Sequence, residues 1–582
     1  MIGEYISREW RYMAITAITV AILAFIPVSR DYQYGGHSWN SVPPSGYYLA
    51  RIREIKDGYP LLGNPFILEH KDGLAPAFFI PDWIATIPYL LGASLLMVIA
   101  INNVLWALVF VLLLYILFRR LELSPIVTSV GSLFAYTQVY SLMQSQVSMQ
   151  IIFPFYLFFL ITLFDWLNDI ENSKKQLLIA LATSLTLYTY NYTAQVAFLT
   201  LILIGCVFIF RKKWKYAMNT ISIGLWSALF SLPAIVITLN QLRNQYYFET
   251  LRRIGVVYSH LPVAEVWYSG RWIVAGIVFL FIILSIAKQD KKRLWATCGS
   301  LSSIGVGMFA VGLTNVISGL ELETAQHIQR FVIVWLVIVV FVGGRMLLEI
   351  FRNGDSGKKG YVLLGLFTIL CLGNYSYFGD VNEVFGSINS KYIEERQEYA
   401  APLEYIDEQE SEPVVIWTRA GSELSSYVQV LSRNYSLFEN MGILHLLSTG
   451  EVEERYLVSK YLEDPKKEDI MDDLQLFAGS AVNRHDTNVR NRWNRLCTIL
   501  HLSIIGADCL TPITREEYNK GYVDLLYARY EKEIVPNIAH EVSKYNVKYI
   551  IKDKVNDEEF TPERLEGVML VYEDARFSVY KK

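Results

Sequence analysis

Residues 12–29 read YMAITAITVAILAFIPVS and run directly into SRDYQYGGHSWNSVPPSGYYLARIREIKDGYPLLGNPFILEH at residues 29–70. The first stretch is an apolar run of about the length that crosses ~30 Å of hydrocarbon. No small-residue cleavage site follows it, so it indicates an uncleaved first span rather than a signal peptide. The second stretch crowds glycine, proline, aromatic and charged residues into one early loop. Together they predict a membrane protein with a polar loop at the membrane surface.

The composition of the whole chain agrees with this interpretation. Of its 582 residues 53% are hydrophobic, and the mean hydropathy is +0.29. The apolar residues come in blocks of roughly 18–25, as membrane spans require. The formal net charge of -4 is small, which argues against a nucleic-acid partner.

The apolar blocks predict about eleven spans. Their ranges are 12–29, 94–118, 124–141, 148–167, 176–190, 194–210, 216–238, 271–287, 294–312, 331–350 and 361–378. Residues 76–92 contain Pro81, Asp82 and Pro88, so we interpret them as a juxtamembrane or half-inserted helix. If they were a full span, the predicted orientation of every later span and loop would be inverted.

Basic residues set the predicted orientation of these spans. With a cytoplasmic N-terminus, the cytoplasmic connections contain Arg119-Arg120, Lys174-Lys175 and the clusters at 211–215, 288–293 and 352–359. Cytoplasmic loops carry this excess of lysine and arginine. We therefore predict a multi-pass protein of the cell membrane, with its N-terminus in the cytoplasm and its C-terminal part outside.

The character of the chain changes near residue 380. Residues 380–582 are charged and mixed, with strand-like runs PVVIWT, NVKYIIK and GVMLVYEDARFSVY and helical stretches between them. Alternating strand and helix patterns favour an α/β domain. We predict a transmembrane domain at 1–379, with outer loops 30–75 and 239–270, and an extracytoplasmic α/β domain at 380–582. Cys497 and Cys509 can pair there if the compartment is oxidising.

The segment SGYYLARIREIKDG, at residues 45–58, has helical periodicity with an apolar face, which suits a helix in the membrane interface. It continues into LLGNPF and then Glu69-His70. A first span, a long outer loop with this motif, many aromatic-rich spans and an outer C-terminal domain resemble the GT-C superfamily of integral membrane glycosyltransferases, in its poorly characterised bacterial branches. The resemblance covers the architecture of nearly the whole chain, and its sharpest local match is residues 47–70.

The resemblance implies a polyprenyl-phosphate-linked sugar donor, an acceptor outside the cytoplasm and an acidic residue of the first outer loop at the active centre. Asp31 is the first candidate catalytic base, because it follows the first span where the family's first acidic motif falls. Glu69 is the second. A sugar hydroxyl needs a carboxylate to orient it or take its proton. This sequence departs from the family before Tyr47, where residues 43–46 read Pro-Pro-Ser-Gly in place of acidic residues.

Several further residues are candidate substrate contacts, because arginine binds phosphate and aromatic rings stack on sugars. The first loop supplies Arg51, Asp57 and His70; the loop at 239–270 and the residue after it supply Arg243, Arg252, Arg253 and Arg271; and the start of a late span supplies His327 and Arg330. GT-C proteins often place a phosphate-binding arginine near a late span, so the resemblance favours Arg330 for that function. Polar residues inside or near the spans are further candidates to line a sugar-sized cavity, although interhelical hydrogen bonding is the commoner reason for them. They are Gln138, Gln144, Gln146, Gln150, Tyr188, Tyr190, Asn191 and Tyr192. A surface helix that attracts anionic lipid is the plainer explanation of the arginines at 239–270.

The predicted function is transfer of a sugar to an envelope glycan, glycolipid or protein, such as a cell-envelope polysaccharide. Membrane lipid is a further partner. The sequence contains no clear metal-binding motif. A divalent metal ion is still a possible cofactor, and Glu69-His70 is a weak candidate for binding it. One alternative is a flippase or transporter of lipid-linked sugars, which would need charged residues along a path through the spans. Another is a catalytically inactive GT-C-like scaffold, which the missing acidic pair favours.

Overall fold

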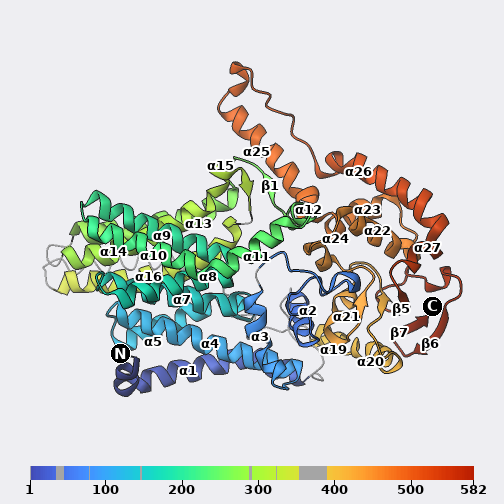
Figure 1. The fold of residues 1–582 in the computed structure, drawn as a ribbon, viewed down its shortest axis with the longest axis horizontal. Coiled ribbons are helices and arrows are strands. Elements are labelled where there is room, and N and C mark those ends of the chain that lie inside the picture. The colour runs from blue at the N-terminus through green and yellow to red at the C-terminus, as the bar shows by residue number, and fades with distance from the viewer. Residues whose placement is uncertain are drawn as a thin grey trace.

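The computed structural model describes residues 2–33, 45–77, 79–144, 147–286, 291–322, 324–352 and 390–582. A bundle of long helices and a mixed-sheet domain lie end to end along the long axis of the molecule (Figure 1). The N-terminus lies at the far end of the bundle, and the C-terminal domain lies beyond the other end. We call the second of these the domain-facing end of the bundle.

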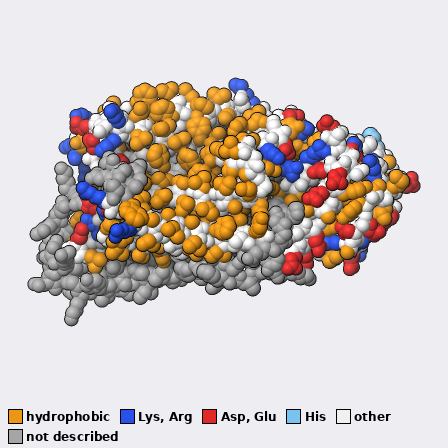
Figure 2. All heavy atoms as spheres, turned by 90° about the horizontal axis from the view of Figure 1, so that it is seen from below, with side chains coloured by type: hydrophobic (Ala, Val, Ile, Leu, Met, Phe, Trp, Pro, Cys, Tyr) orange, Lys and Arg blue, Asp and Glu red, His pale blue; other side chains and the backbone are white. Residues whose placement is uncertain are grey.

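Apolar helices form most of the bundle. They are α1 (Ile2–Gln33), α4 (Leu95–Arg120), α5 (Pro125–Gln138), α7 (Ser148–Leu167), α8 (Ser173–Thr189), α9 (Asn191–Phe210), α10 (Trp214–Phe230), α11 (Leu232–Arg243), α13 (Ala264–Ile286), α14 (Lys291–Gly312) and α16 (Thr324–Arg352). In the described ranges seven helices are long and apolar enough to cross a membrane, and the α10–α11 pair, bent by 58°, makes up to eight. Apolar side chains cover the flank of the bundle (Figure 2). The fold is that of a polytopic α-helical membrane protein.

Predicted spans up to 331–350 fall on helices, although 124–141 crosses from α5 into the short α6 (Tyr140–Gln144) and 216–238 crosses the bend between α10 and α11. The predicted span at 361–378 lies outside the described residues. The helices α5 and α8 have only 14 and 17 residues, less than a membrane crossing usually needs. The total of about eleven therefore stays a prediction. The broken segment at 76–92 forms α3 (Ile80–Leu90), whose 11 residues reach only about 17 Å.

Small residues let the bundle close around a buried tryptophan. Trp335 is fully buried and donates its indole N–H to the Leu301 carbonyl at 2.9 Å. A Cβ at Gly276 or Gly305 would meet its ring at 2.6–2.7 Å. Glycines at helix contacts allow such close approach in membrane bundles.

The C-terminal domain is built on a five-stranded sheet in the order β4-β3-β5-β7-β6. The strands are β3 (Val415–Trp417), β4 (Tyr435–Ser436), β5 (Val547–Asp553), β6 (Met569–Glu573) and β7 (Phe577–Lys581). β3 pairs in parallel with β4 and β5, whereas β7 pairs antiparallel with β5 and β6. All the strands predicted from sequence are present, which confirms the α/β class; β4 was missed because a two-residue strand shows no alternation.

Helices surround this sheet and extend from it. They are α19 (Ser390–Gln397), α20 (Ala400–Gln409), α21 (Glu423–Leu431), α22 (Thr449–Ser459), α23 (Lys467–Asp472), α24 (Leu474–Phe477), α25 (Asp486–Ile499), α26 (Arg515–Arg529) and α27 (Ile538–Ser543). Cys497 and Cys509 form a disulfide with their Cα atoms 5.3 Å apart. This is the pairing that the sequence left open.

The early loop belongs to the core of the C-terminal domain. The chain between α1 and α3, which we call the α1–α3 connection (residues 45–77), contains α2 (Ser45–Lys56) and the single turn η1 (Leu68–His70). Leu49, Ile52 and Phe66 are fully buried in one cluster with Trp417 and Val428. The sequence boundary at 379/380 therefore does not separate two independent cores.

We predict that the C-terminal domain is reached from outside the cell and that the far end of the bundle is not. A cysteine replacing exposed Glu408 should react with a membrane-impermeant maleimide in intact cells, whereas one replacing exposed Lys213 should react only after lysis. The background variant carries Cys206→Ser, Cys298→Ala and Cys371→Ser, because these are the cysteines of the full sequence outside the Cys497–Cys509 pair. The opposite pattern would invert the orientation.

Candidate active site

The α1–α3 connection is held to the bundle by a buried ion pair. Arg51 on α2 binds both carboxylate oxygens of Asp82 on α3, at 2.7 and 2.8 Å, and donates to the Tyr47 hydroxyl at 3.0 Å. Arg51 and Asp82 are only 4% exposed. Such a pair is costly to desolvate, but removing one partner would leave a buried charge uncompensated. Arg51 therefore fixes α2 against α3.

The LLGNPF motif packs tightly against the C-terminal domain. A Cβ at Gly63 would overlap the His70 carbonyl and the backbone of Gly73, so only glycine fits. The carbonyl of Gly63 accepts from His445 at 2.6 Å, and Asn64 donates to the Gly442 carbonyl at 3.0 Å. Burial lowers the pKa of His445 to about 3. His445 is thus a neutral structural donor.

Glu69 and His70 contact charged residues of α22. Arg455 donates to Glu69 at 2.7 Å and to Glu451 at 3.0 Å, and His70 Nε2 lies 2.9 Å from Glu451. Burial raises the pKa of Glu451, but its hydrogen bond with His70 and the charge of Arg455 outweigh this and lower the pKa overall. The group joins the α1–α3 connection to the C-terminal domain.

The two neighbouring arginines of α12 (Tyr247–Ile254) differ in their surroundings. Arg253 is 3% exposed and donates to the carbonyls of Ile443, His445 and Leu447 and to two threonine hydroxyls. Gly479, at φ +74°, lies so close to the Arg253 backbone that a Cβ would overlap its carbonyl oxygen. Arg252 is 49% exposed and pairs with Asp486 at 2.5 Å. Only Arg253 is built into the junction.

Protein groups thus bind most of the loop residues that the sequence proposed for substrate. Asp57 also has a protein partner, Arg53 at 3.4 Å. Asp31 lies in the last turn of α1, and its side chain is outside the described residues. The catalytic assignments of Asp31 and Glu69, and the substrate assignments of the loop residues, stay predictions.

A second polar group lies at the start of α16. His327 Nδ1 is hydrogen-bonded to the Tyr190 hydroxyl. The ring of Tyr192 stacks on His327 with centroids 4.6 Å apart, and Tyr190 meets Tyr192 edge to face at 5.0 Å. Arg330 follows His327 by three residues, a spacing that places both on one helix face. We call Tyr190, Tyr192, His327 and Arg330 the α16 cluster.

Arg330 differs from the junction arginines in its surroundings. Its side chain is half-buried, yet it forms no hydrogen bond or ion pair with any residue in the described ranges. A guanidinium carries five N–H donors in a planar fork that matches phosphate. Arg243 is likewise without such a partner in the described part of the chain, but it is exposed at the end of α11.

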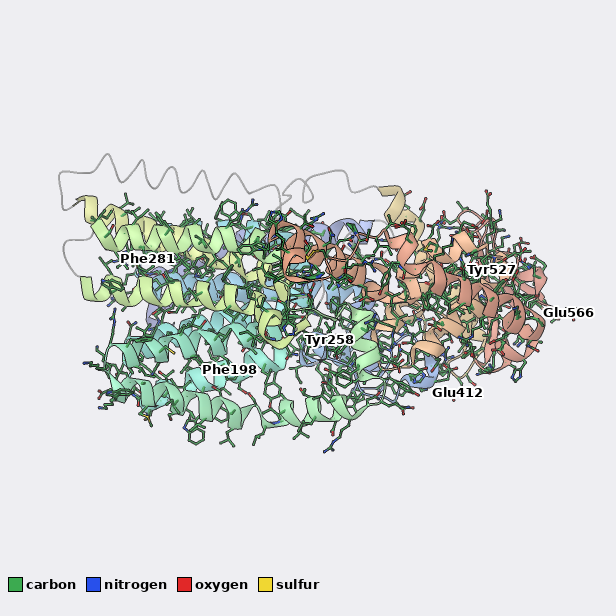
Figure 3. The ribbon with its side chains drawn as sticks, turned by 90° about the horizontal axis from the view of Figure 1, so that it is seen from above. Phe198, Tyr258, Phe281, Glu412, Tyr527 and Glu566 are labelled. Carbon is green, nitrogen blue, oxygen red and sulfur yellow. A yellow bond between two sulfur atoms is a disulfide. The ribbon has the colours of Figure 1, made fainter. Side chains whose placement is uncertain are left out.

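Backbone pairing brings the beginnings of α13 and α16 together. β1 (Val257–Tyr258) pairs antiparallel with β2 (Leu320–Glu321), directly before these helices. Figure 3 shows Tyr258 where the bundle meets the C-terminal domain. Arg271, on α13, is exposed and lies over the rings of Tyr268 and Trp272. Helix N-termini carry partial positive charge, so the starts of α13 and α16 favour an anion.

The structure therefore separates the predicted residues into two groups. His327 and Arg330 join Tyr190 and Tyr192 on the bundle, whereas Glu69, His70 and Arg253 lie at the domain junction. No group of three His, Cys, Asp or Glu residues suited to a metal ion occurs in the part of the chain that is described. The candidate active site with the best chemical support is the α16 cluster.

Sequence reasoning missed Glu54, a carboxylate at the junction whose pKa is strongly raised. Glu54 on α2 is 5% exposed and accepts from the Tyr435 hydroxyl at 3.1 Å. Burial raises its pKa to about 8, against the opposing effect of the Tyr435 hydrogen bond. Glu54 lies between arginine and lysine in REIK, a pattern typical of a solvated helix face. Its partner is 381 residues away in the chain, so no local signal could reveal the burial.

No protein-family model matches the chain, and no curated protein matches it. Two solved structures are similar to it over nearly its whole length. ArnT from Cupriavidus metallidurans in the apo state is 11% identical, with 97% of each chain covered and a TM-score of 0.44. ArnT from the same organism bound to undecaprenyl phosphate is 11% identical, with 98% of this chain and 97% of that chain covered and a TM-score of 0.41.

Replacing Arg253 should weaken the domain junction far more than replacing Arg252. Arg253→Ala leaves several buried acceptors unsatisfied, at about 1–3 kcal/mol each, whereas the exposed Arg252 pair contributes about 0–1 kcal/mol. We expect Arg253→Ala to lower the thermal unfolding midpoint in detergent by roughly 6 °C or more, and Arg252→Ala to change it little. Equal effects of the two variants would contradict the structural assignment of Arg253.

The buried Glu54 predicts a pH-dependent stability. Its pKa is about 8 in the folded protein against an ordinary 4.5, so the folded state holds the proton more tightly than the unfolded state. The free energy that the protonated Glu54 contributes to the folded state is present in full below pH 4.5. This contribution declines as the pH rises toward 8 and is absent above it. The unfolding midpoint should therefore fall more between pH 5 and pH 8.5 in the wild type than in Glu54→Gln. Parallel pH profiles would show that Glu54 is not buried as described.

Proposed function

We propose that the protein is a membrane glycosyltransferase of the GT-C type that transfers a sugar from a polyprenyl-phosphate donor to an acceptor in the cell envelope. The observation that carries the proposal is the half-buried guanidinium of Arg330, without a partner among the described residues, on the same helix face as His327. The proposal also rests on the resemblance of residues 47–70 to the GT-C superfamily.

The chemistry of the α16 cluster suits a donor held at the bundle end. Arg330 would bind the phosphate with charge-assisted hydrogen bonds, and it would stabilise the charge that develops as the sugar departs. Tyr192 and His327 are stacked in parallel planes 8° apart and offer a flat aromatic edge beside it. The lipid tail of the donor would lie along the apolar flank of the bundle (Figure 2).

The second requirement is a base for the acceptor hydroxyl. Asp31 lies at the end of α1, whose N-terminus is at the far end of the bundle, so its backbone lies toward the domain-facing end. We assign the base to Asp31 and keep Glu69 as the second candidate. Glu69 is 35% exposed although Arg455 binds it, so it retains access to solvent. A metal ion remains open as a further group.

The other functions that the sequence left open have weaker support. A flippase needs charged groups along its path, and the predicted spans 94–118, 176–190 and 194–210 contain no Asp, Glu, Lys or Arg. The arginines at the predicted outer side oppose an inactive scaffold, and Arg330 is half-buried without a partner among the described residues. Transfer is therefore the function that the described residues support best.

We predict that Arg330→Ala and Asp31→Asn separate binding from chemistry. Arg330→Ala should weaken binding of polyprenyl phosphate by about tenfold or more, because a charge-assisted hydrogen bond is worth about 1.5–3 kcal/mol. Asp31→Asn should bind it normally but abolish release of polyprenyl phosphate from a panel of polyprenyl-phosphate sugars. Native mass spectrometry of the protein in nanodiscs measures the binding, and thin-layer chromatography measures the release.

Lys215→Ala is the matched control, because Lys215 is an exposed basic residue after α9, away from the cluster. Unchanged binding in Arg330→Ala would refute the phosphate site. Full turnover in Asp31→Asn would show that Asp31 is not the catalytic base and would assign this role to Glu69 or Asp57 instead. Binding without turnover in the wild type, across the sugar panel with a crude envelope acceptor, would favour the inactive scaffold.

A further inference from the structure

An arm of the C-terminal domain exposes large apolar side chains at its tip. We call residues 486–510 the α25 arm; they comprise α25, the short turn η6 (Leu502–Ile505) and the chain back to Leu510. At its tip Ile499, Leu500, Ile504 and Ile505 are 73%, 56%, 82% and 79% exposed. The Cys497–Cys509 disulfide closes the loop behind them.

The composition of the tip does not suit a surface that faces water. Residues 499–507 read ILHLSIIGA and include no Asp, Glu, Lys or Arg. Burying an isoleucine or leucine side chain is favourable by roughly 1.5–3 kcal/mol. Contiguous exposed apolar side chains of this kind mark a binding surface for protein or membrane.

Ion pairs and hydrogen bonds hold the arm against the end of the bundle. Arg492 on α25 pairs with Glu321 of β2 at 2.5 Å and donates to the Pro262 carbonyl at 3.3 Å. At the base of the arm, His485 lies 2.8 Å from the Gly255 carbonyl. The position of the tip is therefore coupled to the segments that lead into α13 and α16.

The arm projects sideways at the level where the bundle meets the C-terminal domain. In Figure 1 the far end of α25 reaches back along the long axis to about the level of α15 (Thr314–Ser318) and stands clear of the flank of the bundle. In Figure 3 the arm lies over the same junction. It therefore extends beside the bundle rather than over its end.

Exposed aromatic and apolar residues on neighbouring elements mark this level as a membrane boundary. Tyr258, Trp267 and Tyr268 are 72%, 61% and 59% exposed, and Ile317 on α15 is 89% exposed. Tryptophan and tyrosine concentrate at the two interfaces of a membrane protein with lipid and water. An apolar tip at this level, beside the bundle, faces lipid.

We infer that the tip of the α25 arm inserts into the lipid beside the bundle and anchors the C-terminal domain to the membrane surface. The side chains behind the tip suit this position. Trp493 donates its indole N–H to the Asp508 carbonyl at 2.8 Å, which places an aromatic residue next to the tip. Arg495 is exposed and has no hydrogen bond or ion pair with any described residue, so it is available to a lipid phosphate.

The inference is independent of the proposed glycosyl transfer, and a depth measurement tests it. A nitroxide spin label is attached to Ile505→Cys in the Cys206→Ser, Cys298→Ala, Cys371→Ser background, and the protein is placed in nanodiscs with one copy per disc. Leu525→Cys is the matched control, because Leu525 is a comparably exposed apolar residue, at 72%, on α26 of the same domain. Mass spectrometry verifies one label per chain and an intact Cys497–Cys509 bond.

We expect the label at position 505 to collide several-fold more often with oxygen, which concentrates in lipid, than with a water-soluble nickel chelate. The label at position 525 should show the reverse. A preference for the nickel chelate at both positions would overturn the inference. Water-like accessibility at position 505 together with dipolar coupling between copies in liposomes would also overturn it, and would assign the tip to a contact between two copies.

Discussion

The burial of the α1–α3 connection in the C-terminal domain is the constraint on which the rest of the structure depends. Leu49, Ile52 and Phe66 lie in the same apolar core as Trp417, a residue of the central sheet. Removing these side chains from water couples two parts of the chain that are more than 300 residues apart. The C-terminal domain therefore cannot move away from the bundle without exposing its own core.

Charged residues at this junction act as connectors because they are buried with their partners. Arg51 is neutralised by Asp82, Arg253 is surrounded by backbone carbonyls, and Arg455 bridges Glu69 and Glu451. Each pairing offsets a desolvation penalty that the isolated charge could not bear. Their directional hydrogen bonds also set the register of the junction, which apolar contact alone would leave loose.

The α16 cluster differs from the junction in how its arginine is surrounded. Arg330 is half-buried without a protein partner among the described residues, so its guanidinium is not neutralised by any of them. His327 and the two tyrosines bind one another and hold an ordered aromatic surface next to it. The contrast between paired arginines at the junction and the unpaired arginine on the bundle is what distinguishes a connector from a candidate site.

The sequence by itself determined the helical bundle, the position of its helices and the α/β class of the C-terminal domain. Apolar runs of spanning length and strand-like alternation are local patterns, so they can be read without knowing the fold. It also indicated His327 and Arg330, because charged residues at the start of a span are unusual. The tertiary structure decided which charges are engaged: Glu69 meets Arg455 and Glu54 meets Tyr435 across 386 and 381 residues of chain. Electrostatic partners depend on distance in space, and folding alone brings such distant residues together.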